Sequence, residues 1–157
     1  MILAEKKEFS GINTRRRQSL VANPHACTGC RTCEAICSLI KTGAIAPDMA
    51  RIGIDRRPFK GEFVQRICLQ CSIPYCLNAC PVGAIRISNK IGTVLIDKHT
   101  CDGCGLCKAA CPYGVIVIDT ETEKAYKCDL CNGNPQCVKS CPMNALGIAV
   151  FGNELLP

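Results

Sequence analysis

Short apolar segments alternate with polar turn sequences along most of the chain, and this pattern predicts small strands joined by hairpins. Apolar and polar residues alternate at residues 50–55, 62–67, 82–87, 93–97, 115–119, 124–127 and 145–150. Residues 56–61 and 120–123, together with Asn89 and Gly92, predict the turns. The pattern therefore indicates an α+β protein in which loop, short helix and hairpin recur.

Four cysteine runs lie between these segments. Residues 101–112 read C-x₂-C-x₂-C-x₃-C-P, the spacing with which bacterial ferredoxins bind [4Fe–4S] clusters. Residues 27–37 repeat this spacing with Ser38 in place of proline, and two further runs lengthen the third gap. The quartets are Cys27, Cys30, Cys33 and Cys37; Cys68, Cys71, Cys76 and Cys80; Cys101, Cys104, Cys107 and Cys111; and Cys128, Cys131, Cys137 and Cys141. No cysteine is left over, so we expect four [4Fe–4S] clusters and sixteen cysteine ligands.

The spacing has a physical reason. Three thiolates from one tight loop reach three corners of a cluster, while the fourth cysteine begins a helix that points away and ligates the other cluster of a pair. Gly103 and Gly105 let the backbone approach the cluster, whose sulfides accept N–H hydrogen bonds. Each quartet is therefore expected to serve two clusters.

Nested pairing of the quartets is favoured, because only 20 residues with one hairpin separate Cys80 from Cys101, as in a small two-cluster ferredoxin. The second and third quartets would then form an inner pair, and the first and fourth an outer pair. The expected ligand sets are Cys68, Cys71, Cys76 and Cys111; Cys101, Cys104, Cys107 and Cys80; Cys27, Cys30, Cys33 and Cys141; and Cys128, Cys131, Cys137 and Cys37. Sequential pairing, first with second and third with fourth, is the alternative.

The composition indicates a thin apolar core. The 157 residues include only 4 Phe, 3 Tyr and no Trp, so bound clusters would supply much of the cohesion. We predict that the chain without iron is largely unfolded. The expected organisation is an N-terminal arm over residues 1–26 and a cluster domain over 27–157, with the inner pair in 68–111 and the outer pair in 27–67 and 112–157.

Other cysteine-rich classes fit less well. Disulfide scaffolds need an oxidising compartment, but residues 1–30 lack the apolar region of a secretory signal, and the arginine run at 15–17 precedes no apolar stretch. Zinc sites pair two C-x₂-C units and do not need this four-cysteine spacing. No segment has the apolar length of a membrane helix, so a cytoplasmic protein with reduced thiols is expected.

The formal charge of +6 at pH 7 would suit a nucleic-acid-binding protein. Each oxidised cluster with four thiolates carries about −2, so four clusters lower the formal charge of +6 to about −2. The basic residues therefore offset cluster charge, and no nucleic acid is expected as a partner. We also find no phosphate loop, catalytic triad or nucleotide fingerprint, so no catalytic residue is expected.

Histidines and tyrosines near the quartets have simpler roles than ligation. His25 and His99 precede quartets that already contain four cysteines, so both are expected to be loop residues. Tyr75, Tyr113 and Tyr126 are expected to pack over clusters and shield them from water.

Two motifs resemble those of a known family. The sequences KCDLC at 127–131 and PQCVKSCP at 135–142 resemble the last motif of four-cluster electron-transfer subunits, and CSIPYCLNACP at 71–81 resembles their second motif. The resemblance covers residues 27 to about 147 and implies a duplicated two-cluster ferredoxin fold with nested pairing. Such subunits accompany molybdenum and tungsten enzymes, and some hydrogenases, formate dehydrogenases and carbon monoxide dehydrogenases.

The compact layout, with a short segment between Cys37 and Cys68, is most similar to small subunits beside tungsten aldehyde oxidoreductases of anaerobes and beside carbon monoxide dehydrogenase. The resemblance implies a non-catalytic subunit that relays single electrons between a tungsten or molybdenum catalytic subunit and a flavin subunit or ferredoxin. Self-association is a further option. The alternatives are a free polyferredoxin and a cluster-bearing regulator, although a regulator usually needs one labile cluster rather than four.

Overall fold

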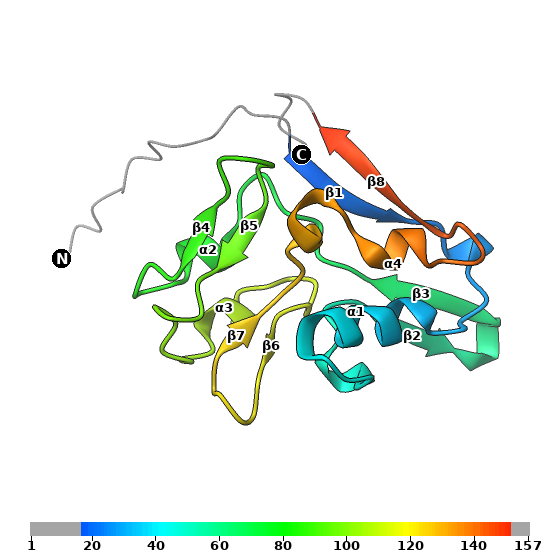
Figure 1. Ribbon diagram of the computed structural model, residues 1–157, viewed down its shortest axis with the longest axis horizontal. Helices are drawn as coiled ribbons and strands as arrows, with labels where there is room; N and C mark the ends of the chain where they lie inside the picture. Colours follow the sequence, from blue (N-terminus) through cyan, green and yellow to red (C-terminus); the bar gives the residue numbers. More distant parts are fainter. Residues whose placement is uncertain (1–16, 152–157) are drawn as a thin grey trace.

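Small antiparallel sheets and short helices make up the computed structural model, which describes residues 17–151 (Figure 1). The helices are α1 (Thr32–Thr42), α2 (Tyr75–Asn78), α3 (Leu106–Ala109) and α4 (Gln136–Lys139). The strands are β1 (Arg17–Ala22), β2 (Gly53–Arg57), β3 (Glu62–Arg66), β4 (Ile85–Ile87), β5 (Val94–Ile96), β6 (Val117–Ile118), β7 (Ala125–Tyr126) and β8 (Leu146–Phe151). Short 3-10 turns cover Pro24–Ala26, Pro47–Met49, Pro58–Lys60 and Leu130–Gly133.

The strands pair in four separate two-stranded sheets, β1–β8, β2–β3, β4–β5 and β6–β7. Three are local hairpins, whereas β1–β8 joins the two ends of the described chain, with Arg17 opposite Phe151 and Ala22 opposite Leu146. Figure 1 shows the middle of the chain, with α2, α3 and β4–β7, beside a second half formed by β1–β3, β8, α1 and α4. Segments far apart in sequence therefore form one half of the molecule.

Each half has its own small core. Leu20, Ile52 and Leu130 are buried in the outer half, and Ala84, Val94 and Ile116 are buried in the middle half. Cysteines supply much of the rest of both cores, and Cys111 packs against both. The scarcity of large buried side chains agrees with the composition.

Each of the seven segments predicted as strands overlaps a strand, and the loop, short helix and hairpin recur as expected. The prediction of an N-terminal arm is wrong for residues 17–22, because they form β1 in the body of the fold and Leu20 is buried. Residues 1–16 of that arm lie outside the described residues. Within residues 17–151, no helix has the length and apolar character that crossing a bilayer requires.

The expectation that the fourth cysteine of each quartet begins a helix is wrong: the helices begin just before the third cysteine, and only α1 extends past the fourth. Helices α2, α3 and α4 end before a Cys-Pro pair, whereas α1 continues through Cys37 to Thr42 and ends at Gly43 in the left-handed region. Ser38, which replaces the proline, is fully buried; its hydroxyl donates to the Ala35 carbonyl at 3.0 Å and accepts from Ala46 N–H at 3.1 Å. A serine keeps the N–H that proline lacks, so the helix continues.

Candidate metal centres

The structure gathers the cysteines around four cavities, each lined by three cysteines of one quartet and the last cysteine of another. We call these groups A to D. Group A is Cys80, Cys101, Cys104 and Cys107; group B is Cys68, Cys71, Cys76 and Cys111; group C is Cys37, Cys128, Cys131 and Cys137; group D is Cys27, Cys30, Cys33 and Cys141. These are the four sets that nested pairing predicts.

The short helices bring the two kinds of cysteine together. Helix α2 holds Cys76 of group B and is followed by Cys80 of group A, while α3 holds Cys107 of group A and is followed by Cys111 of group B. Helix α4 holds Cys137 of group C and is followed by Cys141 of group D, whereas α1 contains both Cys33 of group D and Cys37 of group C. Each pair of helices is in contact. The three residues between the third and fourth cysteines of a quartet therefore connect two neighbouring cavities.

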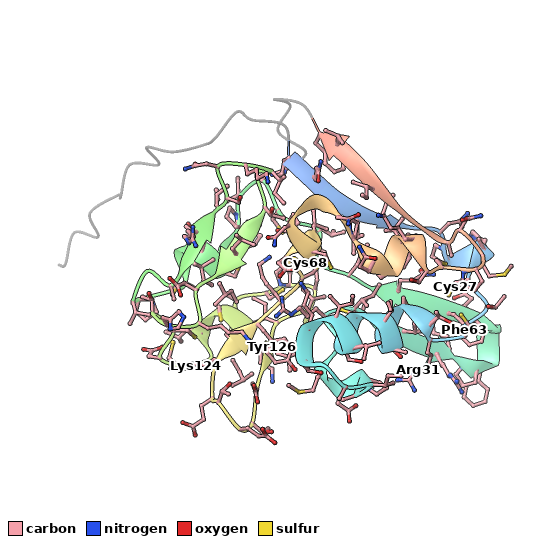
Figure 2. All side chains as sticks on the ribbon, viewed as in Figure 1. Cys27, Arg31, Phe63, Cys68, Lys124 and Tyr126 are labelled. Atoms are coloured by element: carbon pink, nitrogen blue, oxygen red, sulfur yellow. The ribbon has the colours of Figure 1, made fainter. Side chains whose placement is uncertain are left out.

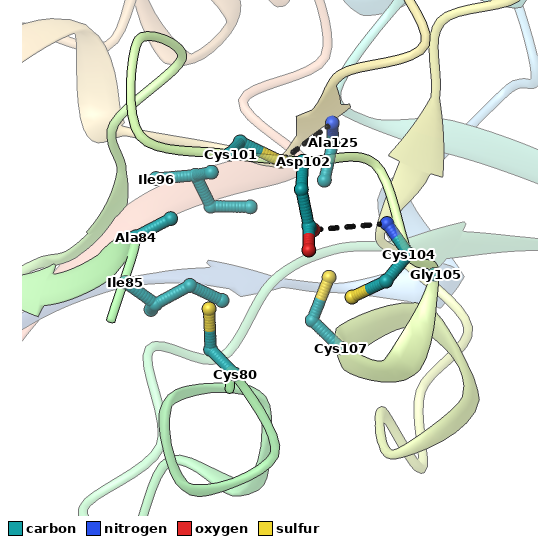
Figure 3. A pocket seen from close by; sticks show the side chains of 10 residues that line it. All are labelled: Cys80, Ala84, Ile85, Ile96, Cys101, Asp102, Cys104, Gly105, Cys107 and Ala125. Atoms are coloured by element: carbon teal, nitrogen blue, oxygen red, sulfur yellow. Dashed lines mark hydrogen bonds between the residues drawn. The ribbon is translucent and has the colours of Figure 1, made fainter. Parts of the chain in front are cut away.

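Cavity A shows the arrangement most plainly (Figure 3). The Cys104 and Cys107 side chains converge with that of Cys80, which comes from the turn after α2. Gly103 and Gly105 both have positive φ, +79° and +75°, which shapes the loop around the cavity. A Cβ on Gly103 would also collide with the Glu123 carbonyl oxygen, so only glycine fits there.

Backbone N–H groups point at several cysteine sulfurs. Ala125 donates to Cys101 Sγ at 3.5 Å, Arg51 to Cys37 Sγ at 3.3 Å and Ala145 to Cys141 Sγ at 3.3 Å. Gly29 and Leu130 donate in the same way to Cys27 and Cys128. Such bonds stabilise thiolates bound to iron and adjust the reduction potential.

Cavity D contains an unpaired buried amide. Gln65 on β3 is 7% exposed, lines this cavity, and neither its Nε2 nor its Oε1 has a hydrogen-bond partner among the described residues. A buried amide without a partner is costly, so the cavity suits a bound group that can accept from Nε2. Beside it, the Phe63 ring occupies the space that a Cβ on Gly29 would need. Figure 2 shows Phe63 near Cys27 at one end of the molecule.

Cavity B is lined by a buried lysine. Lys127 is 4% exposed, and its ammonium lies 3.4 Å from Cys68 Sγ. It also donates to Gln70 Oε1 and to the Cys128 carbonyl, both at 3.2 Å. Because Cys128 belongs to group C, these contacts join cavity B to cavity C near the centre of the molecule, where Figure 2 labels Cys68.

Burial makes the free thiols weak acids. It raises the pKa of Cys33 and Cys76 to about 11, and the pKa of Cys128 and Cys137 to about 12. These residues hold thiolates at neutral pH only with a strong positive charge beside them, as bound iron provides. At the surface, the hydrogen bond with Thr32 lowers the pKa of Cys30.

The donor sets fit an iron–sulfur cluster. Each cavity presents four soft sulfur donors, several of these sulfurs accept N–H hydrogen bonds, and the unpaired Gln65 amide lines cavity D. Across residues 17–151, no set of three or more His, Cys, Asp or Glu side chains is arranged to hold a single metal ion.

Other candidate residues fall in different places. Tyr75 and Tyr113 line cavity B, as expected for shielding residues, but both are substantially exposed. Tyr126, which was also expected to shield a cluster, is buried but lines none of the four cavities, and its hydroxyl donates to the Asp48 carbonyl at 3.4 Å. His25 and His99 are exposed and line none of the four cavities. Gln65, Gln70 and Lys127 were not predicted, because burial of a polar side chain has no local sequence pattern.

Comparison with known proteins agrees with these cavities. Residues 59–151 match the 4Fe-4S dicluster domain, and residues 24–43 match a 4Fe-4S binding domain. The polyferredoxin-like subunit of aliphatic sulfonate oxidoreductase from Pyrococcus furiosus is 40% identical over 122 residues, which are 78% of this chain and 70% of that protein.

Two further relatives are components of other oxidoreductases. The beta subunit of NADH-dependent phenylglyoxylate dehydrogenase from Aromatoleum evansii is 36% identical over 84% of this chain. The chain spans only 30% of that subunit's length. A chain of the active-site complex BamBC of benzoyl coenzyme A reductase superposes with a TM-score of 0.54 and 26% identity, covering 87% of this chain and 81% of that one.

Proposed function

Because this chain belongs to the family of ferredoxin-like 4Fe-4S electron-transfer subunits, which are non-catalytic, we propose that its sixteen cysteines hold four [4Fe–4S] clusters. The observation that carries the proposal is that four cavities take four cysteines each and use all sixteen. Each bound cluster supplies one-electron chemistry, taking up and releasing a single electron.

The cysteine groups follow the order A, B, C, D. Groups A and B adjoin through α2 and α3, and groups C and D adjoin through α1 and α4. Groups B and C adjoin through Lys127, which contacts Cys68 Sγ and the Cys128 carbonyl. This order supports a single relay path along the molecule rather than two independent pairs.

The ends of this path are the most open. Among the cysteines, Cys104 of group A and Cys30 of group D are exposed, whereas those of groups B and C are buried or half-buried. An electron carrier needs its terminal centres near the surface and its middle centres away from water. We propose that electrons enter at one of these ends and leave at the other.

The chain's residues position the clusters and set their surroundings. They do so by fixed cysteine geometry, N–H bonds to sulfur and burial, and no side chain needs to transfer a proton. The relatives belong to three different oxidoreductases, which supports a common relay role beside varied catalytic subunits.

We propose a catalytic subunit of the tungsten or molybdenum type as the partner, with tungsten aldehyde oxidoreductase as the specific candidate, and a flavin subunit or ferredoxin on the other side. This rests on the compact layout between Cys37 and Cys68 described above. Free thiols in such number suit a reducing compartment, so we propose the cytoplasm.

Metal analysis of the protein purified from its own host without oxygen tests the proposal. Four clusters require about 16 Fe per chain. Co-purifying tungsten would support a tungsten oxidoreductase as the partner, and molybdenum or nickel would indicate a different enzyme. Full iron without a second metal would favour a free polyferredoxin. Zinc in place of iron would contradict the four-cluster function altogether.

A further inference from the structure

Lys127 lies where the two halves of the molecule meet, and its surroundings are unusual for a lysine. It is the residue between β7 and the first cysteine of the last quartet, and it is 4% exposed. Lysine is rarely buried unless its charge is compensated, because removing an ammonium from water is costly. A specific source of compensating charge is therefore required.

No carboxylate supplies it within residues 17–151, where the ion pairs involve Arg31, Lys41, Arg51, Arg57 and Arg66 but not Lys127. The Lys127 ammonium instead contacts Cys68 Sγ, Gln70 Oε1 and the Cys128 carbonyl at 3.4, 3.2 and 3.2 Å. Of these, only the sulfur can carry a full negative charge. The burial of Lys127 is thus explained by an anionic thiolate group in cavity B.

Gln70 holds the ammonium in this position. It is 1% exposed, and its amide Nε2 donates to the same Cys128 carbonyl at 2.8 Å. Its Oε1 accepts from Val94 N–H at 2.9 Å as well as from Lys127. The amide is therefore fixed by two backbone groups, one from each half of the molecule, and its oxygen faces the ammonium.

From this arrangement we infer that Lys127 is a positioning residue that raises the reduction potential of the group B cluster, at the junction between the two cluster pairs. The inference rests on the proposed four-cluster function. Reduction adds negative charge to a cluster, so a fixed positive charge in contact with one ligand sulfur favours the reduced form. The charge touches a sulfur of group B but only a backbone carbonyl of group C, so group B is affected more.

The consequence concerns the step between the pairs. A higher reduction potential at group B favours an electron on the group B cluster, next to group C, over one on the group A cluster. The same ammonium donates to a carbonyl of group C, so the two groups share one polar network across the gap. Neutralising Lys127 would thus alter the potential of one middle centre and leave the terminal centres nearly unchanged.

Anaerobic redox titration followed by electron paramagnetic resonance tests the inference on the purified chain. Lys127→Gln keeps a hydrogen-bond donor and removes the charge, Lys127→Met removes both, and Lys127→Arg keeps the charge. The matched control is Lys108→Met, because Lys108 also adjoins a cysteine ligand but is exposed. The group B signal is identified as the one lost in Cys71→Ser.

We expect full iron in Lys127→Gln and a lower midpoint potential for the group B signal alone, with Lys127→Arg and Lys108→Met near wild type. Unchanged midpoints in a fully loaded Lys127→Gln would overturn the inference while leaving the four-cluster function intact. If both neutral variants lose one cluster and Lys127→Arg retains it, the charge holds the group B cluster in place rather than setting its potential, which would overturn the inference. Equal loss in Lys127→Arg would show that shape rather than charge matters and would overturn it.

Discussion

The Lys41 ammonium, near the end of α1, lies 2.8 Å from Oδ1 of Asp129, which is 88 residues further along the chain. Arg51 approaches the other oxygen of the same carboxylate at 2.9 Å, and Cys131 N–H donates to Oδ1 at 3.0 Å. Asp129 therefore ties the segment after the first quartet to the loop of the fourth. Burial alone would raise the pKa of Asp129, but the Lys41 hydrogen bond and the Arg51 charge keep that pKa below its usual value.

Replacing Asp129 with asparagine should destabilise the protein by about 2 kcal/mol, because two largely buried cations lose their counter-charge. The measurement is the unfolding temperature of the iron-loaded protein. Asp55→Asn is the control, since its ion pair with Arg66 is exposed and 3.8 Å long, and such pairs contribute about 0–1 kcal/mol. Equal effects from the two changes would contradict this account of Asp129.

Ser38→Pro should shorten α1 and cost about 3 kcal/mol, because proline removes an N–H within the helix and clashes with the preceding turn. The buried hydroxyl contacts of Ser38 would be lost too. Helix content by circular dichroism and the unfolding temperature measure the effect. Pro81→Ser is the reverse control, where α2 has already ended, and it should change stability far less. A stable Ser38→Pro variant with full helix content would contradict the explanation of the length of α1.

Gly103→Ala should cost group A its cluster, so that iron falls from about 16 to about 12 per chain. Alanine combines the strain of φ +79° with a collision against the Glu123 carbonyl oxygen. Gly114→Ala separates these effects, because Gly114 has φ +59° with open space around its Cβ position. That control should keep all its iron and lose only about 1–2 kcal/mol of stability. Iron loss of the same size in both variants would mean that strain, not the collision, governs loading.

Double cysteine variants can decide between nested and sequential pairing. Under nested pairing, Cys71→Ser with Cys111→Ser affects one cluster and leaves about 12 Fe, while Cys111→Ser with Cys137→Ser affects two and leaves about 8. Sequential pairing predicts the opposite order, because Cys111 would then share a cluster with Cys137. The cavities favour the first outcome, since Cys71 and Cys111 line the same one. Iron per chain and the number of cluster signals provide the measurement.

Removing the iron should unfold most of the chain. The two cores are small and contain many cysteine side chains, whose positions bound clusters would fix. Circular dichroism of the chelator-treated protein should show loss of strand and helix content, and adding back iron and sulfide without oxygen should restore it. Native-like spectra after complete iron removal would contradict this prediction.

The cysteine spacing and the local hairpins were predictable because both depend on residues close together in sequence. Strand β1 was not predicted, because its partner β8 is more than a hundred residues away and its own alternation is short. The length of α1 depended on one residue, Ser38. The helix continues there because serine, unlike the proline of the other quartets, keeps its backbone N–H. The buried positions of Lys127 and Gln70 arise only when the two halves meet, which no local pattern reports.

The β1–β8 sheet and the α1–α4 contact join the first and last parts of the chain, so the outer half can form only after the end of the chain has been synthesised. On a ribosome, Cys111 emerges and completes groups A and B while Cys141 is still to be added, so under nested pairing the middle half can load its clusters first. The first quartet to be made, beginning at Cys27, is the last to find all its ligands. Under nested pairing, the thiols of the first quartet therefore wait longest for their full set of ligands, and during that interval they are open to oxygen and to other metals.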